Sequence, residues 1–299
     1  MSEQQQLLSD DLWPRTLAAT ERARAAGALQ TIAASLHFVE QEGIRFGVHV
    51  PAAGDGLRSM ARKGDHSHGN PFLPYDPQMF VAGVSPTHVC LLNKFNVFQH
   101  HLLVVTRAFE EQQAPLGVED FAALWQCLAQ VDGLAFYNAG RAAGASQRHK
   151  HLQLAPFPLW ATEPGAPVEA ALAVETLGGQ PALRSFPYRH AAVRLEREWL
   201  DAPQEAGVEL AQRYRALLGA LGLDHMDKDG LLPAYNLVAT RRWMLLAPRT
   251  QAQIEGIPVN ALGFAGSLLA RTAAHLEVLR TLGPLAVLHK VTGAAELSF

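Results

Sequence analysis

The stretch GASQRHKHLQ, residues 144–153, is the most informative part of this sequence. Its two histidines, His149 and His151, are two positions apart, and Gln153 follows two positions later. If the run is a β-strand, side chains alternate between the two faces of the sheet, so these three point the same way. Such a row suits phosphoryl chemistry, in which one imidazole attacks phosphorus and its neighbours hold the oxygens. The preceding residues 144–147 are expected to form a loop that binds phosphate through hydrogen bonds.

The spacing of these histidines does not by itself choose between three interpretations. His-x-His on a strand is also a common metal-binding pair, and an exposed pair without a role is at least as frequent as a functional one. A second pair, His66 and His68, lies in the loop GDHSHG (64–69) with no further ligands nearby, and we interpret it as loop histidines. The choice for the first pair depends on the sequence around it.

Composition bounds the class of protein. The 299 residues are 48% hydrophobic, which is enough for a core, and a net charge of −3 gives no broad basic surface for nucleic acid. Cys90 and Cys127 lie in apolar surroundings and are expected to be buried free thiols. The first residues are polar and acidic, and no apolar run approaches the ~20 residues of a membrane span. We expect a cytoplasmic protein that binds neither nucleic acid nor membranes.

The periodicity of apolar residues predicts an α+β fold. Short or alternating apolar runs indicate strands at 44–50, 88–93, 101–106, 134–139, 148–156 and 188–195, and a hairpin at 234–248. Helical stripes indicate helices at 17–41, 116–132, 204–222 and 262–282. Residues 51–80 are rich in Gly, Pro and Asp and predict a long loop, which in a compact domain is usually functional or disordered.

Two of the predicted hairpins resemble each other. NVFQHHLLVVTR (96–107) and NLVATRRWMLLAPR (236–249) both run from Asn through a turn to an apolar strand that ends in Arg. The similarity is compatible with two related halves, of which only the first carries the His-x-His strand. We therefore expect residues 1–160 to form the catalytic half and residues 161–299 to complete the sheet and the substrate site, with one catalytic centre.

Five ordered blocks resemble the ATP adenylyltransferase family, the diadenosine tetraphosphate phosphorylases, which are relatives of histidine-triad proteins and galactose-1-phosphate uridylyltransferase. The blocks are NPFLPYDP (70–77), HVCLLNKFNVFQHHLLVVTR (88–107), YNAGRAAGASQRHKHLQ (137–153), AYNLVATRRWMLLAPR (234–249) and NALGFAGSLLAR (260–271). The resemblance implies a histidine-triad-like antiparallel sheet with flanking helices. It also implies a nucleotidyltransferase that cleaves diadenosine tetraphosphate with phosphate to ATP and ADP, or the reverse, through a covalent adenylyl-histidine.

The resemblance assigns roles to individual residues. His151 matches the nucleophile, His149 the preceding histidine that orients it, and Gln153 the glutamine that replaces the third histidine of the hydrolytic branch. The residues that it implies in binding ribose, phosphate or the rest of the nucleotide are Lys63, Asn93, Lys94, Asn138, Gly144, Ala145, Ser146, Gln147, Asn260, Ala261 and Leu262. Ser267 and Arg271 stand where some members have Met and Lys, which puts the nucleotide preference in doubt.

The chemistry of these side chains agrees with such a reaction. Near pH 7 a histidine with a pKa of about 6.5 is largely neutral, so it can approach an anionic phosphorus and form a reactive phosphoramidate. The Gln153 carboxamide can donate an N–H to a phosphate oxygen but cannot act as a general acid, which favours a leaving group such as ATP that needs no proton. Lys150 lies between the histidines and is expected on the opposite face of the strand, in a structural or solvated role.

The expected partners are nucleotides: diadenosine polyphosphate, ATP, ADP and phosphate. Mg²⁺ held mainly by the substrate phosphates would add charge compensation, because no carboxylate cluster for a protein-held metal is evident in the sequence. Two alternatives stay open. One is a relative with a different acceptor, resembling uridylyltransferases or ADP-sulfurylases, and the other is a nucleotide-binding sensor without turnover.

Overall fold

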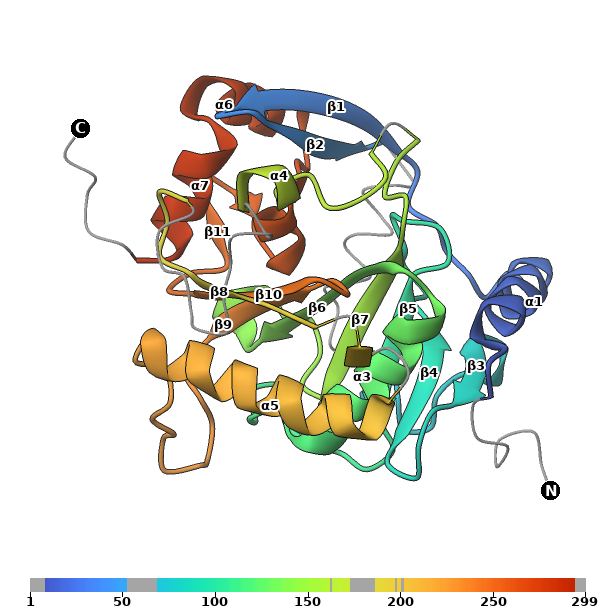
Figure 1. The fold of residues 1–299 in the computed structure, drawn as a ribbon. Helices are drawn as coiled ribbons and strands as arrows, with labels where there is room; N and C mark the ends of the chain where they lie inside the picture. Colours follow the sequence, from blue (N-terminus) through green and yellow to red (C-terminus); the bar gives the residue numbers. More distant parts are fainter. Residues whose placement is uncertain are drawn as a thin grey trace.

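The computed structural model describes residues 9–52, 69–161, 163–172, 186–196, 198–199 and 202–293. Its centre is an eight-stranded antiparallel sheet in the order β3-β4-β5-β7-β6-β9-β10-β8 (Figure 1). The strands are β3 (Phe80–Gly83), β4 (His88–Leu92), β5 (Leu102–Thr106), β6 (Gly133–Ala139), β7 (His151–Pro156), β8 (Ala191–Arg194), β9 (Tyr235–Ala239) and β10 (Trp243–Pro248). The α+β fold with an antiparallel sheet and flanking helices is thereby confirmed.

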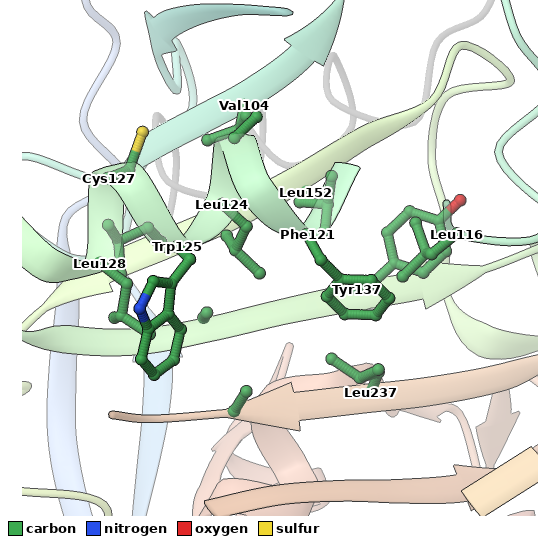
Figure 2. Close-up of a cluster of buried hydrophobic side chains, with 14 of the residues drawn as sticks. Val104, Leu116, Phe121, Leu124, Trp125, Cys127, Leu128, Tyr137, Leu152 and Leu237 are labelled. Carbon is green, nitrogen blue, oxygen red and sulfur yellow. The ribbon is translucent and has the colours of Figure 1, made fainter. Parts of the chain in front are cut away.

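Two helices, α3 (Val118–Gln130) and α5 (Pro203–Ala220), cover one face of this sheet. Figure 2 shows the core between them and the sheet, in which Phe121, Leu124 and Trp125 of α3 are buried, as the apolar stripe predicts. The two helices pack closely because Gly207 has no side chain: a Cβ there would lie 2.8 Å from the Ala122 Cβ. Both cysteines are buried free thiols, as expected.

A smaller layer covers the other face of the large sheet (Figure 1). It contains a three-stranded sheet in the order β1-β2-β13, several short helices and a two-stranded ribbon. These elements are β1 (Ala34–Gln41), β2 (Ile44–Pro51), α4 (Glu169–Leu172), β11 (Gln253–Ile254), β12 (Ile257–Pro258), the 3₁₀ helix Ala261–Ala265, β13 (Ser267–Leu269), α6 (Ala273–Leu282) and α7 (Pro284–Val291). Helix α1 (Leu12–Ala25) lies beside β3 at the sheet edge. No helix among the described residues is long and apolar enough to cross a membrane.

Two helix predictions are wrong in part. The predicted helix 17–41 ends at Ala25, because Gly27 adopts a left-handed backbone (φ 65°), and residues 34–41 form β1 instead. Glu42 and Gly43, both with positive φ, make the tight turn that pairs β1 with β2. The predicted helix 262–282 is divided into a 3₁₀ helix, β13 and α6, since Gly266 (φ 97°) ends the first of these.

The large sheet repeats one arrangement. The units β5-α3-β6-β7 and β8-α5-β9-β10 have the same spatial order, β5-β7-β6 and β8-β10-β9, and they meet where β6 pairs with β9. Hairpin β9–β10 thus corresponds to β6–β7 and not to β4–β5, the pairing that the sequence similarity suggests. The β10 residues that belong to the core on the smaller layer's side, Trp243, Leu245 and Ala247, are apolar, so the second unit carries no counterpart of the His-x-His strand.

Candidate active site

Strand β7 presents the predicted catalytic residues on the face of the sheet opposite to α3 and α5. Leu152 and Leu154 pack in the core with these helices, so the alternating His151 and Gln153 point to the other side. The expectation that these two residues share a face is confirmed. The strand begins only at His151, however, and His149 lies just before it in an isolated bridge with Glu111.

The orientation of the His151 ring is set by the backbone next to it. Its Nδ1 lies 2.8 Å from the backbone oxygen of His149. A carbonyl oxygen can only accept a hydrogen bond, so Nδ1 carries the proton and Nε2 carries the lone pair of the neutral ring. The ring is buried, with 6% exposure, and the ring of Phe72 lies 5.2 Å from it. His151 is therefore held in the tautomer that a nucleophilic Nε2 requires.

A side chain that the sequence analysis missed holds the backbone of His151. The Gln112 Oε1 accepts the His151 N–H at 2.8 Å, and the Gln112 Nε2 donates to the His151 carbonyl at 3.2 Å and to the Asn138 carbonyl at 3.1 Å. Gln112 is 2% exposed. Gln112 thus bonds both the N–H and the carbonyl of the first residue of β7, as a neighbouring strand would.

His149 has both ring nitrogens engaged. Its Nε2 donates to the Thr106 carbonyl at 2.8 Å, and its Nδ1 lies 2.9 Å from the Asn70 amide nitrogen. Burial lowers the pKa of His149, although its bonds to the Thr106 and Ala108 carbonyls act the other way. A neutral, fully bonded ring suits positioning better than attack. His149 contributes its backbone oxygen to His151, while its ring fixes the start of the strand.

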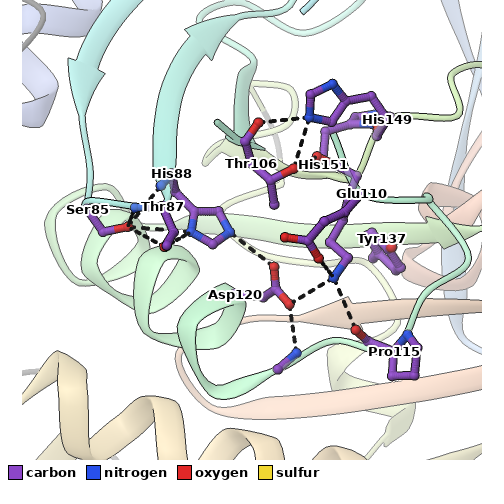
Figure 3. A network of polar contacts seen from close by, with 12 residues as sticks. Ser85, Thr87, His88, Thr106, Glu110, Pro115, Asp120, Tyr137, His149 and His151 are labelled. Carbon is purple, nitrogen blue, oxygen red and sulfur yellow. Dashed lines mark hydrogen bonds and ion pairs between the residues drawn. The ribbon is translucent and has the colours of Figure 1, made fainter. Parts of the chain in front are cut away.

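Lys150 points to the helical face of the sheet, in the structural role that was expected. Its Nζ lies 2.5 Å from a carboxylate oxygen of Glu110 and 3.3 Å from one of Asp120 (Figure 3). Asp120 also accepts a hydrogen bond from the His88 ring at 3.0 Å. Burial raises the pKa of Asp120, but the bond from His88 and the charge of Lys150 outweigh it, so the pKa is lowered. This buried network anchors the segment between the two histidines.

The residues predicted to bind phosphate form a loop after β6. Gly144 has a left-handed backbone (φ 87°), and a Cβ there would lie 2.9 Å from the Val259 carbonyl and 3.1 Å from the Asn260 Cβ. Ala145 bonds back to Gly140 within the loop. Within the described parts of the chain, no acceptor faces the backbone N–H groups of Ser146 and Gln147. These two adjacent amides can therefore donate hydrogen bonds to an anion.

Asn138 connects this loop to the C-terminal segment. Its Oδ1 accepts hydrogen bonds from the Asn236 Nδ2 and from the Ala261 N–H, each at 2.8 Å. Asn236, which the sequence analysis missed, also donates to the Ala143 carbonyl at 2.9 Å. Asn260 caps the 3₁₀ helix through its bond to the Leu262 N–H at 3.1 Å. The structure therefore brings together Asn138, residues 260–262 and Gly144, the first residue of the predicted phosphate loop.

The other predicted binding residues lie in a turn after β4 and in the smaller layer. The Asn93 side chain contacts His101 and accepts the Phe95 N–H at 3.2 Å, which is a turn role, and Lys94 is exposed beside it. Ser267 pairs with Gly47 in the small sheet, and Arg271 follows that strand at the surface. These last two do not lie on the sheet that carries His151. Lys63, His66 and His68 fall outside the described residues.

A protein-held metal centre has no ligand set in the described regions. No three His, Cys, Asp or Glu side chains gather there in a way that could hold a metal ion.

Comparison with known proteins identifies the family. Residues 2–174 match the Ap4A phosphorylase N-terminal domain, and residues 184–294 match the ATP adenylyltransferase C-terminal domain. Together these two domains define a class of nucleotidyltransferases. The chain belongs to the Ap4A phosphorylase family, in which Ap4A is diadenosine tetraphosphate, as the sequence blocks indicate.

Two kinds of relative support the assignment. Diadenosine 5',5'''-P1,P4-tetraphosphate phosphorylase 2 of Saccharomyces cerevisiae is 27% identical over 250 residues, which are 75% of each chain. The crystal structure of yeast Ap4A phosphorylase Apa2 has a TM-score of 0.78 at 21% identity and covers 98% of both chains. Apa2 in complex with Ap4A has a TM-score of 0.75, also at 21% identity, over 96% of this chain and 99% of that one. These likenesses confirm the fold.

Proposed function

We propose that this protein is a nucleotidyltransferase that cleaves Ap4A with phosphate to ATP and ADP, and that it catalyses the reverse reaction. The observation that carries the proposal is the bond of the His151 Nδ1–H to the His149 carbonyl at 2.8 Å. It leaves the lone pair on Nε2 of the first residue of β7, and the loop that precedes this strand has two amides with no acceptor in the described chain. Family membership supports the choice of substrate.

The reaction takes two displacements. In the first, the His151 Nε2 attacks the phosphorus that carries one adenosine, a P–N bond forms, and the P–O bond to the rest of Ap4A breaks, so ATP leaves. The ring becomes cationic, which strengthens the bond from its Nδ1–H to the His149 carbonyl. In the second, an oxygen of inorganic phosphate attacks the same phosphorus, the P–N bond breaks, and ADP leaves with His151 restored.

Neutral N–H donors are proposed to stabilise the negative charge of the phosphates through hydrogen bonds. The amides of Ser146 and Gln147 would bind nonbridging oxygens, and the Asn138 Nδ2 has no acceptor among the described residues and stays available as a donor. Gln153 would donate an N–H without supplying a proton. Mg²⁺, bound by the substrate phosphates, is part of the proposal, and so is a cytoplasmic location.

The proposal is tested by incubating the protein with adenine-labelled Ap4A in the presence and absence of phosphate. Without phosphate we expect one burst of ATP and label that stays on the protein after alkaline denaturation. With phosphate we expect ATP and ADP in equal amounts. Release of AMP without phosphate would indicate a hydrolase, and binding without products would indicate a sensor. Either result contradicts the proposed reaction.

A further inference from the structure

Arg249, like Lys150, is a buried cation. It lies just after β10 and contacts the residue that precedes the phosphate loop. Its side chain is 5% exposed. The guanidinium donates to the Asn236 Oδ1, to the Gln251 carbonyl at 2.6 Å, and to the Ala143 carbonyl at 3.4 Å. Ala143 immediately precedes the loop of residues 144–147. Arg249 thus contacts the base of this loop.

Arg249 differs from the buried Lys150 in having no counter-charge within the described residues. Lys150 is neutralised by Glu110 and Asp120, whereas no carboxylate in the described chain pairs with Arg249, and its Nε has no hydrogen-bond partner. Burial lowers the pKa of Arg249 to about 9, so the side chain is still charged at neutral pH. An uncompensated buried charge destabilises a fold, so we infer that Arg249 gains its counter-charge from the bound ligand.

The bonds of Arg249 also fix the orientation of two amides. Arg249 donates to the Asn236 Oδ1, so the Asn236 Nδ2 must face the Asn138 Oδ1 and the Ala143 carbonyl. The Asn138 Oδ1 is in this way occupied from the protein side, and its Nδ2 is the group that remains. Arg249 therefore helps to set the donor direction of Asn138, together with the Ala261 N–H, and it bonds the residue that precedes the loop.

We propose that Arg249 is a positioning residue whose missing counter-charge is the polyphosphate of the bound nucleotide. It does not touch the substrate. It places a positive charge behind the loop of residues 144–147 and orients the Asn236–Asn138 pair toward the phosphates. The inference depends on the proposed function only in taking the ligand to be a nucleoside polyphosphate.

The test compares how tightly ADP and adenosine bind, because the two ligands share a nucleoside and differ in charge. Calorimetry measures both dissociation constants for the wild type, Arg249→Gln and Arg249→Lys. Glutamine can still donate to Asn236 but is neutral, and lysine keeps the charge without the forked set of N–H donors of the guanidinium. We expect Arg249→Gln to lower the ratio of ADP affinity to adenosine affinity by about tenfold or more, and Arg249→Lys to change it by less than about threefold.

The matched control is Arg280→Gln on α6, where the arginine is half exposed and paired with Glu277. It should leave the ratio unchanged. An Arg249→Gln protein that weakens ADP and adenosine equally would overturn the proposal, because the residue would then be structural only. If Arg249→Gln does not fold, Arg249→Lys decides: a loss confined to ADP and as large as tenfold would show that the charge is not what matters.

This test needs no turnover, so it is separate from the test of the proposed reaction. A wild-type protein that binds ADP but forms no products from Ap4A would contradict the reaction while the role of Arg249 stands. Conversely, full activity of Arg249→Gln at saturating Ap4A with an unchanged affinity ratio would contradict this inference alone.

Discussion

The backbone oxygen of His149 accepts the Nδ1–H of His151 at 2.8 Å, so one histidine fixes the tautomer of the other. The bond is local, since it joins residues two apart in the chain. Its geometry nevertheless depends on distant contacts, because Thr106 and Asn70 hold the ring of His149 and Gln112 holds the backbone of His151. The reacting ring and the groups that hold it are thus separate parts of the site.

Gln112→Ala should lower kcat with little change in KM. The substitution removes both bonds to the His151 backbone, so the imidazole is less well placed for attack. It also removes the bond to the Asn138 carbonyl, but the Asn138 side chain keeps its bonds to Asn236 and Ala261. We expect a loss of about tenfold to a hundredfold in kcat, and about 1–3 kcal/mol in the free energy of unfolding. Gln113→Ala is the matched control, since that side chain bonds the Leu232 carbonyl. Equal kcat values for the two variants would contradict the role of Gln112.

His151→Ala and Gln153→Ala should differ in severity. The first removes the nucleophile, and phosphorolysis of Ap4A should fall to background. The second removes one donor to a phosphate oxygen, for which a loss of about 10²–10³ in kcat is typical. Initial rates of ATP formation at saturating phosphate measure both. A His151→Ala protein that keeps a rate comparable with the wild type would remove His151 from the mechanism.

Lys150→Met should destabilise the fold far more than Arg148→Met. The first change removes the cation from the buried Asp120, whereas Glu110 is half exposed and can be solvated. We expect a cost of about 3 kcal/mol, at the lower end for breaking a buried ion pair, because Asp120 keeps its bond from His88. The second removes an exposed pair with Glu111, in which the Arg148 side chain is 80% exposed, and should change the stability little because water screens such a pair. Urea unfolding followed by circular dichroism distinguishes them. Similar midpoints for both variants would show that the buried network is not stabilising.

His49→Phe should make the protein less sensitive to mild acid. Burial lowers the pKa of His49 from 6.5 to about 4, so the unfolded chain takes up a proton at this residue before the folded chain does. The contribution to stability is complete above pH 6.5 and is lost as the pH falls toward 4, by about 3 kcal/mol. Unfolding free energies between pH 7 and 4 should fall less steeply in His49→Phe than in the wild type or in His225→Phe, in which an exposed ring is replaced. Parallel profiles would contradict this.

The sequence was sufficient to predict the structure wherever the period of side chains along one strand or helix determines it. Alternation along β7 predicts that His151 and Gln153 share a face and that Lys150 points away, because side chains on any strand alternate. The same holds for the apolar stripe of α3. Local patterns failed at residues 26–41, where alanine-rich composition hid the turn at Gly27 and the hairpin turn at Glu42 and Gly43.

Other parts of the site could not be predicted, because they depend on contacts between distant segments. Gln112 is 39 residues from His151, and Asn236 is 98 residues from Asn138. A single glutamine or asparagine in a loop or strand carries no spacing signal. Arg249 ends a hairpin motif in the sequence, but its burial depends on how that hairpin packs in the fold.

The central claim is that His151 carries the adenylyl group through its Nε2. The most direct test is to mix the protein with Ap4A in the absence of phosphate, quench in alkali, digest, and locate the AMP adduct by tandem mass spectrometry. We predict one adduct, on His151, that disappears as ADP when phosphate is added before the quench. An adduct on another residue, or turnover to ATP and ADP in which no adduct forms at any time, would contradict the account.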